Sequence, residues 1–178
     1  ECSLIVLQLE IPLATVYHAI AFGQKHHIPV LLNPAPAIKD LDIEKVCACD
    51  FFVPNETELA ILTGMPTETR QDVEQAAASL IERGLKNVIV TLGGRGALWM
   101  TADEKQYIEA YQVNAVDTSG AGDAFIGCFC SSYVQDRDVL AAMQRASAFA
   151  ALSVTRKGTQ MSYPTREELE DFLRPRVS

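Results

Sequence analysis

Residues 117–125 read DTSGAGDAF, in which two carboxylates flank a small-residue turn and an apolar run follows. Glycines such as Gly120 and Gly122 let a ligand approach the backbone closely. If a helix begins near Gly122, its first N–H groups and the positive end of its dipole create an anion site. Asp123 could then take a proton from an alcohol nucleophile while the N–H groups stabilise a phosphoryl group in transfer. The alternative is a plain glycine turn with Asp123 as the helix cap.

Upstream of this stretch, apolar runs typical of buried strands alternate with segments of helical spacing. The pattern predicts strands at 4–9, 28–33, 50–55 and 87–94, a hairpin over 95–116, and helices at 13–27, 42–48, 56–64, 70–83, 123–134, 138–155 and 165–173. Strands that alternate with helices indicate an α/β fold, a three-layer sandwich with a mostly parallel sheet and helices on both faces. The length suits a single domain over residues 1–178.

Ligands of such folds bind outside the carboxyl ends of the strands. The strand ends here supply Glu10, Asn33, Asn55, the pair Gly93–Gly94 and the loop at Asp117. These segments lie far apart in sequence, and we expect them to converge on one rim of the sheet.

The motif NETE follows the third strand, and its Asn55 and Glu58 are three residues apart on one face of a starting helix. An amide and a carboxylate in that position could hold the water shell of Mg²⁺, which usually keeps several waters. The alternative is a capped acidic first turn that the helix dipole favours.

Two further loops carry small or polar residues. TLGGRGA (91–97) could let a nucleotide lie against the backbone, with Arg95 beside a phosphate, or it could be a β-turn. It matches neither the dinucleotide nor the P-loop glycine motif. SVTRKGTQMSYP (153–164) could offer carbonyls that bind a monovalent cation together with Asp117, or it could be a solvated connection.

Bulk properties restrict the partners. The net charge of −8 argues against nucleic acid or an anionic membrane, since either needs a basic surface. No apolar run reaches the roughly 18 residues of a membrane span. The five cysteines lack zinc-site spacing, so we expect reduced thiols in a cytoplasmic protein.

The motifs NPAPA, PNETE, TLGGRGA, DTSGAGDAF and TRKGTQ, in this order, closely resemble the ribokinase family of carbohydrate kinases. The resemblance extends over essentially the whole chain. It implies an ATP-dependent kinase that phosphorylates the 5-hydroxyl of ribose or 2-deoxyribose, with ATP, Mg²⁺ and K⁺ as cofactors.

The same resemblance assigns roles to individual residues. Asp123 matches the catalytic base, and Gly120, Ala121 and Gly122 match the anion hole around the phosphoryl group. Glu10 matches a sugar-contacting glutamate. Asn55 and Glu58 would serve ATP and hydrated Mg²⁺. The nucleotide would lie along Thr91, Leu92, Gly93, Gly94, Arg95 and Gly96, and K⁺ would be bound by Asp117, Ser119, Ser153, Arg156, Gly158 and Ser162, largely through backbone carbonyls.

Family members are longer, and the chain, which begins at Glu1, resembles their C-terminal, nucleotide-binding part without the N-terminal strands and lid. We therefore expect the chain alone to be weak or inactive, and the full-length protein to be a possible homodimer. Three alternatives stay open: a kinase for another sugar or a nucleoside, a non-catalytic nucleotide-binding module, and a structural interaction domain.

Overall fold

The structure is a computed structural model that describes residues 2–174. It comprises two compact units, one built from the residues up to 92 together with 98–107, and one from residues 93–97 and the residues from 108 onward. Whether the whole chain behaves as one domain stays a prediction.

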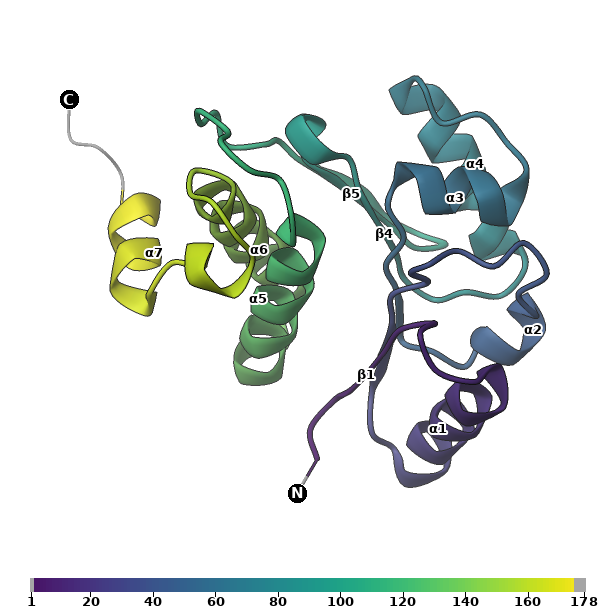
Figure 1. The fold of residues 1–178 in the computed structure, drawn as a ribbon. Helices are drawn as coiled ribbons and strands as arrows, with labels where there is room; N and C mark the ends of the chain where they lie inside the picture. The colour runs from purple at the N-terminus through teal and green to yellow at the C-terminus, as the bar shows by residue number, and fades with distance from the viewer. Residues whose placement is uncertain (1, 175–178) are drawn as a thin grey trace. The chain divides into compact units, whose positions relative to one another are not determined.

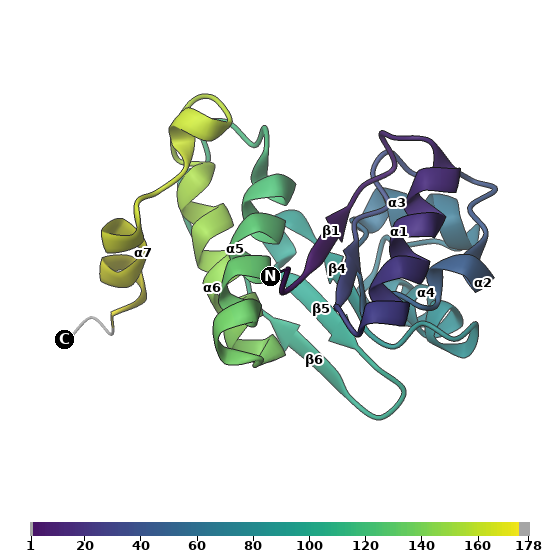
Figure 2. The same cartoon turned by 90° about the horizontal axis from the view of Figure 1, so that it is seen from below.

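The first unit is built around a six-stranded sheet whose strands follow one another in sequence order. They are β1 (Ile5–Leu7), β2 (Val30–Leu32), β3 (Phe51–Phe52), β4 (Val88–Thr91), β5 (Ala97–Met100) and β6 (Lys105–Ile108). Neighbouring strands from β1 to β4 pair in parallel. β5 and β6 form a hairpin through residues 101–104 (Figure 2). The α/β class and the mostly parallel sheet are thus confirmed.

Four helices cover the same face of this sheet (Figure 1). They are α1 (Leu13–His26), α2 (Ile43–Val46), α3 (Glu56–Thr63) and α4 (Arg70–Glu82). Their apolar sides share one core with alternate strand residues, among them Leu32, Phe52 and Val90. This core holds the strand ends in place, because Leu59 and Ala77 bring α3 and α4 onto the same sheet face.

The burial of β1 differs from the prediction of a strand covered on both faces. Val30, Leu31 and Leu32 of β2 are fully buried, whereas Val6 of β1 is 47% exposed. β1 is the end strand of the sheet and pairs only with β2 among the described residues. The prediction was therefore right for β2 and wrong for β1, since an end strand has fewer neighbours to cover it.

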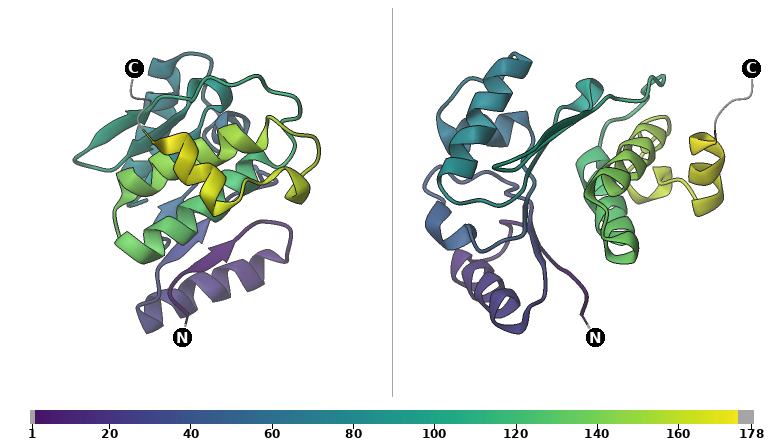
Figure 3. Two further views of the ribbon diagram at one scale, coloured as in Figure 1. Left: turned by 90° about the vertical axis from the view of Figure 1, so that its left-hand side faces the viewer. Right: turned by 180° about the vertical axis from the view of Figure 1, so that it is seen from behind.

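The second unit is helical. It contains the short 3₁₀ turns η1 (Gly93–Arg95) and η2 (Gln160–Ser162) and the helices α5 (Ala121–Asp136), α6 (Val139–Ser153) and α7 (Arg166–Leu173). α5 and α6 pack side by side along their length, and α7 packs on α6 (Figure 3). The rings of Phe125, Phe129 and Tyr133 stack in succession along α5, with centroid separations of 6.4 and 5.9 Å.

α5 begins at Ala121, two residues before the predicted start at Asp123. The reason is Gly120, whose left-handed φ of 75° lets the chain turn directly into the helix. All five cysteines are free thiols. Within residues 2–174, no helix is both long enough and apolar enough to cross a bilayer.

Candidate functional site

The start of α5 is closed by a glycine and by no side chain. Gly120 is the N-cap, makes no side-chain cap hydrogen bond, and accepts the N–H of Ala124 at 2.8 Å. Asp123 lies within the first turn, is exposed, and is not the cap. The glycine turn of the alternative is therefore present, but Asp123 is not its N-cap.

Two residues of the 153–164 loop flank this helix start. A Cβ placed on Gly120 would lie 3.3 Å from Cγ2 of Thr159 and 3.5 Å from the hydroxyl oxygen of Tyr163. Burial, with a contribution from the charge of Asp123, raises the pKa of Tyr163. Sequence reasoning missed both residues as neighbours of the helix start. The available signal was their place in a polar loop already assigned to the site.

Asp117 ties the loop before α5 to the loop after α6. Its carboxylate accepts the backbone N–H of Gly158 at 2.9 Å and that of Ser119 at 3.0 Å. These two bonds, the one from Gly158 first, lower its pKa to about 2. The carbonyl of Val154 accepts the N–H groups of Val116 and Asp117 at 2.7 and 3.1 Å. The structure thus brings together Asp117, Ser119 and Gly158 of the predicted cation set.

The other members of that set have side chains with different partners. The hydroxyls of Ser153 and Ser162, both buried, donate to the carbonyls of Ala150 and Thr159 at 2.8 and 2.7 Å. The guanidinium of Arg156 pairs with a carboxylate of α7. What these three residues can offer a cation is their backbone carbonyls, the kind of ligand that the family resemblance implies.

Asn55 and Glu58 bind one another at the start of α3. The side-chain oxygen of Asn55 accepts the N–H of Glu58 at 2.8 Å, and the Glu58 carboxylate accepts the N–H of Asn55 at 2.7 Å. This reciprocal capping box satisfies two otherwise orphaned donors. Burial raises the pKa of Glu58, against the lowering effect of the Asn55 N–H. The capped turn is therefore present in the structure.

A Mg²⁺ role for this pair is compatible with the cap in one form. Among the described residues, no group of three or more acidic, histidine or cysteine side chains could enclose a metal. Mg²⁺ often relies instead on one or two carboxylates, waters and the phosphates of its nucleotide. The Mg²⁺ role of Glu58 stays a prediction, because the residue is 9% exposed and its carboxylate already accepts the Asn55 N–H.

Three strand ends of the first unit meet at one edge of the sheet. The Asn33 amide donates to the Val53 carbonyl at 2.8 Å, and Asn55 forms a parallel bridge with Thr91. Glu10 is exposed and follows Leu9, whose N–H donates to Ala35 of the NPAPA segment at 2.9 Å. Asn33 and Asn55 thus lie at the same edge, as predicted, and Thr91 lies beside Asn55. The convergence of all the site loops on one rim stays a prediction.

The predicted nucleotide segment has mixed character. Leu92 is 2% exposed and packs into the core, so its side chain cannot line a ligand. Gly96 has a φ of 93°, and a Cβ there would lie 1.9 Å from the Ile108 carbonyl oxygen, so its glycine is required by packing. No described atom lies within 4 Å of a Cβ placed on Gly93 or Gly94, which leaves their backbone approachable. The N–H of Gly96 donates to Gly93 at 3.0 Å, so this segment is also a tight turn.

These features belong to a recognisable family, because residues 2–166 match the pfkB family of carbohydrate kinases. The chain belongs to this family. A deoxyribokinase from Salmonella typhi is 63% identical over 173 residues, which cover 97% of this chain and 56% of that protein.

Solved structures of pfkB-like kinases agree with the fold. The ribokinase of Arabidopsis thaliana, complexed with ribose and ATP, matches with a TM-score of 0.90 and 33% identity, over 96% of this chain and 55% of that one. A structure from E. coli in complex with ATP and Mg²⁺ matches with a TM-score of 0.77 and 30% identity, over 97% and 58%. The chain thus spans about half the length of the relatives it matches. The prediction of the family is confirmed. The covered fractions of the relatives' length do not confirm that the chain corresponds to their C-terminal part.

Proposed function

We propose that this chain carries the phosphoryl-transfer site of an ATP-dependent sugar kinase that acts on the 5-hydroxyl of 2-deoxyribose or ribose. The observation that carries the proposal is the start of α5, which is capped by Gly120 and has Asp123 in its first turn, in a member of a carbohydrate kinase family. The identity with a deoxyribokinase supports the choice of sugars.

Asp123 acts as the general base in this proposal. It takes the proton of the sugar 5-hydroxyl while that oxygen bonds to the γ-phosphorus of ATP, and the bond from the γ-phosphorus to the bridging oxygen of ADP breaks. Gly120, Ala121 and Gly122 supply backbone dipoles at the positive end of α5, where negative charge develops on the phosphoryl oxygens. The left-handed Gly120 lets the chain turn into the helix without a side chain of its own at the N-cap.

The remaining site residues bind and orient in the proposal. Glu10 contacts the sugar, and the segment from Thr91 to Gly96 lies along the nucleotide, with its approachable backbone at Gly93 and Gly94 and Arg95 beside a phosphate. Mg²⁺ bound with ATP would neutralise phosphate charge, and Glu58 would hold its water shell. The carbonyls of the 153–162 loop, with Asp117, would hold K⁺ near the anion site, where a cation lowers the cost of gathering negative charge.

We place the protein in the cytoplasm, with sugar and ATP as its small-molecule partners and a homodimer as a possible assembly. The free thiols and the acidic net charge are consistent with this environment.

An assay of ADP formation tests the proposal. The chain is measured alone and within its complete gene product, with 2-deoxyribose, ribose or fructose, and with K⁺ or Na⁺. We expect sugar-dependent ADP formation by the complete product, faster with a five-carbon sugar than with fructose, and little by the chain alone. Preference for fructose would favour a kinase for another sugar. Nucleotide binding without sugar-dependent turnover would favour a non-catalytic module.

A further inference from the structure

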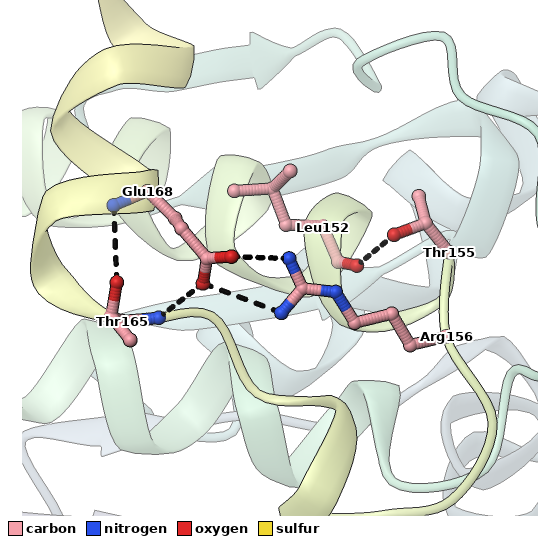
Figure 4. Close-up of polar contacts among 5 residues, drawn as sticks. All are labelled: Leu152, Thr155, Arg156, Thr165 and Glu168. Atoms are coloured by element: carbon pink, nitrogen blue, oxygen red, sulfur yellow. Dashed lines mark hydrogen bonds and ion pairs between the residues drawn. The ribbon is translucent and has the colours of Figure 1, made fainter.

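The 153–162 loop is held from outside by a carboxylate of α7. The guanidinium of Arg156 approaches Glu168 with both terminal nitrogens, at 2.5 and 3.3 Å, as Figure 4 shows. A two-pronged arginine–carboxylate contact fixes direction as well as distance. The loop is therefore oriented by a helix that supplies none of the predicted ligands.

Glu168 is itself held rigidly. Its carboxylate also accepts the N–H of Thr165 at 2.7 Å, and its own N–H donates to the Thr165 hydroxyl at 3.2 Å (Figure 4). This capping box fixes the first turn of α7. Arg156 first, and then Thr165, hold the pKa of Glu168 at about 2, so the Glu168 carboxylate is charged at any physiological pH.

Arg156, the loop residue that Glu168 binds, lies two residues before Gly158, which contacts Asp117 of the proposed cation site. Arg156 precedes Lys157 and Gly158, and the Gly158 N–H is the donor that reaches the Asp117 carboxylate. On the other side, the Thr155 hydroxyl donates to the Leu152 carbonyl at 2.7 Å, which fixes the loop to the end of α6 (Figure 4). The loop is thus held at Thr155, Arg156 and Gly158 in succession.

We propose that Glu168 is a positioning residue, which through Arg156 holds Gly158 against Asp117 and so arranges the loop carbonyls for a monovalent cation. The cation part rests on the proposed function, whereas the hold on the loop does not. Because an exposed ion pair contributes little free energy, we expect a graded effect on cation affinity and no loss of fold.

The chain offers a matched control on the same helix. Glu170 of α7 also binds an arginine, Arg145, at 2.5 Å, but Arg145 lies on α6 and not on the loop. Glu168→Gln and Glu170→Gln therefore each remove one charge and one arginine partner from α7. The amide that Glu168→Gln introduces would keep an oxygen that can accept the Thr165 N–H, so the helix cap is retained.

Two measurements on the complete gene product test the inference. Hydrogen exchange of peptides covering 153–163 should become faster in Glu168→Gln and stay near wild type in Glu170→Gln. The K⁺ concentration for half-maximal activity should rise roughly two- to fivefold in Glu168→Gln, as expected for loss of an exposed ion pair. Activity at saturating K⁺ should stay within about twofold, because the site is still formed.

Arg156→Gln sharpens the test. If Glu168 acts through Arg156, Arg156→Gln should raise the K⁺ concentration for half-maximal activity as Glu168→Gln does. The double variant should then raise it little further. A lower K⁺ concentration for half-maximal activity in Arg156→Gln would mean that Arg156 acts only by repelling the cation with its positive charge. That result would overturn the inference. Unchanged exchange in Glu168→Gln would overturn it too. Absence of K⁺ activation in the wild type would instead contradict the cation site itself, while the exchange result would still decide whether Glu168 holds the loop.

Discussion

The helices α3 and α5 each carry a carboxylate in the first turn, but their N-caps differ. At α3, Asn55 and Glu58 bind each other's backbone and close the helix start. At α5, the N-cap is Gly120, which makes no side-chain cap hydrogen bond. The cap of α3 thus uses side-chain oxygens, whereas the N-cap of α5 has no side chain to offer one.

The carboxylates beside these two helix starts also differ in electrostatics. Burial raises the pKa of Glu58, whereas two backbone N–H groups lower that of Asp117 to about 2. A carboxylate that is partly desolvated resists ionisation, and one that accepts N–H donors favours it. The two carboxylates both accept backbone N–H groups, and they differ in that Glu58 is buried and accepts one such group, whereas Asp117 accepts two.

The largest expected effect concerns Asp123. Asp123→Asn removes the proposed base, so kcat should fall about 10²-fold or more with little change in stability. Steady-state kinetics of the complete gene product with 2-deoxyribose measures this. Asp138→Asn is the control, because Asp138 caps α6 in the same unit and Asn caps nearly as well. A near-normal kcat in Asp123→Asn would contradict the assignment of Asp123 as the general base.

A smaller effect is expected on stability at Gly120. Gly120→Ala forces a side chain into a left-handed conformation against Thr159, at a cost of about 1–3 kcal/mol. Gly127→Ala, in the middle of α5 with open space around its Cβ, should instead stabilise by about 0.5–1 kcal/mol. Urea unfolding distinguishes the two. Equal effects would mean that the glycine cap does not define the helix start.

Loss of a side-chain cap should cost less. Asn55→Ala and Thr69→Ala each remove a capping-box side chain, from α3 and α4, and each should destabilise by about 1 kcal/mol. If Asn55 also serves the nucleotide, only Asn55→Ala should raise the KM for Mg–ATP. Equal KM values for Mg–ATP in the two variants would mean that Asn55 caps α3 and has no role in nucleotide binding.

The smallest effects are the opposite pH signatures of Asp117 and Glu58. Asp117 has a folded pKa of about 2 against an ordinary value of 3.8, so its stabilisation is present above pH 3.8 and is lost as the pH falls toward 2. Unfolding free energies of wild type and Asp117→Asn should therefore converge on acidification. The pKa of Glu58 is raised above 4.5, so wild type should lose stability relative to Glu58→Gln as the pH rises through that folded value. Parallel pH profiles would contradict both assignments.

Much of this molecule is predictable from its sequence, for reasons visible in particular residues. The apolar runs that became β2 and β4, and the glycine that ends α3, follow from periodicity and backbone freedom. The pairing of Asp117 with the 153–162 loop was expected from the motifs, and the structure provides it through Gly158.

Other features depend on tertiary contacts that no local pattern encodes. Val6 is exposed because β1 is an end strand, and Leu92 of the nucleotide motif is buried because it packs into the core. The partner of Arg156 lies twelve residues away on another helix, and nothing in TRKG points to it. Tyr163 reaches Gly120 only because the loop folds back on α5.

The strand order of the sheet has a consequence for how the chain is made. Because each strand from β1 to β6 lies next to the one that follows it in sequence, no strand has to wait for a distant later segment before it can pair. The parallel pairs join segments such as Ile5 with Val30 and Phe52 with Val88, and the entropic cost of closing such a loop grows only slowly with its length. During synthesis, the sheet can therefore grow one strand at a time as the polypeptide leaves the ribosome, with each new helix covering the strands already in place.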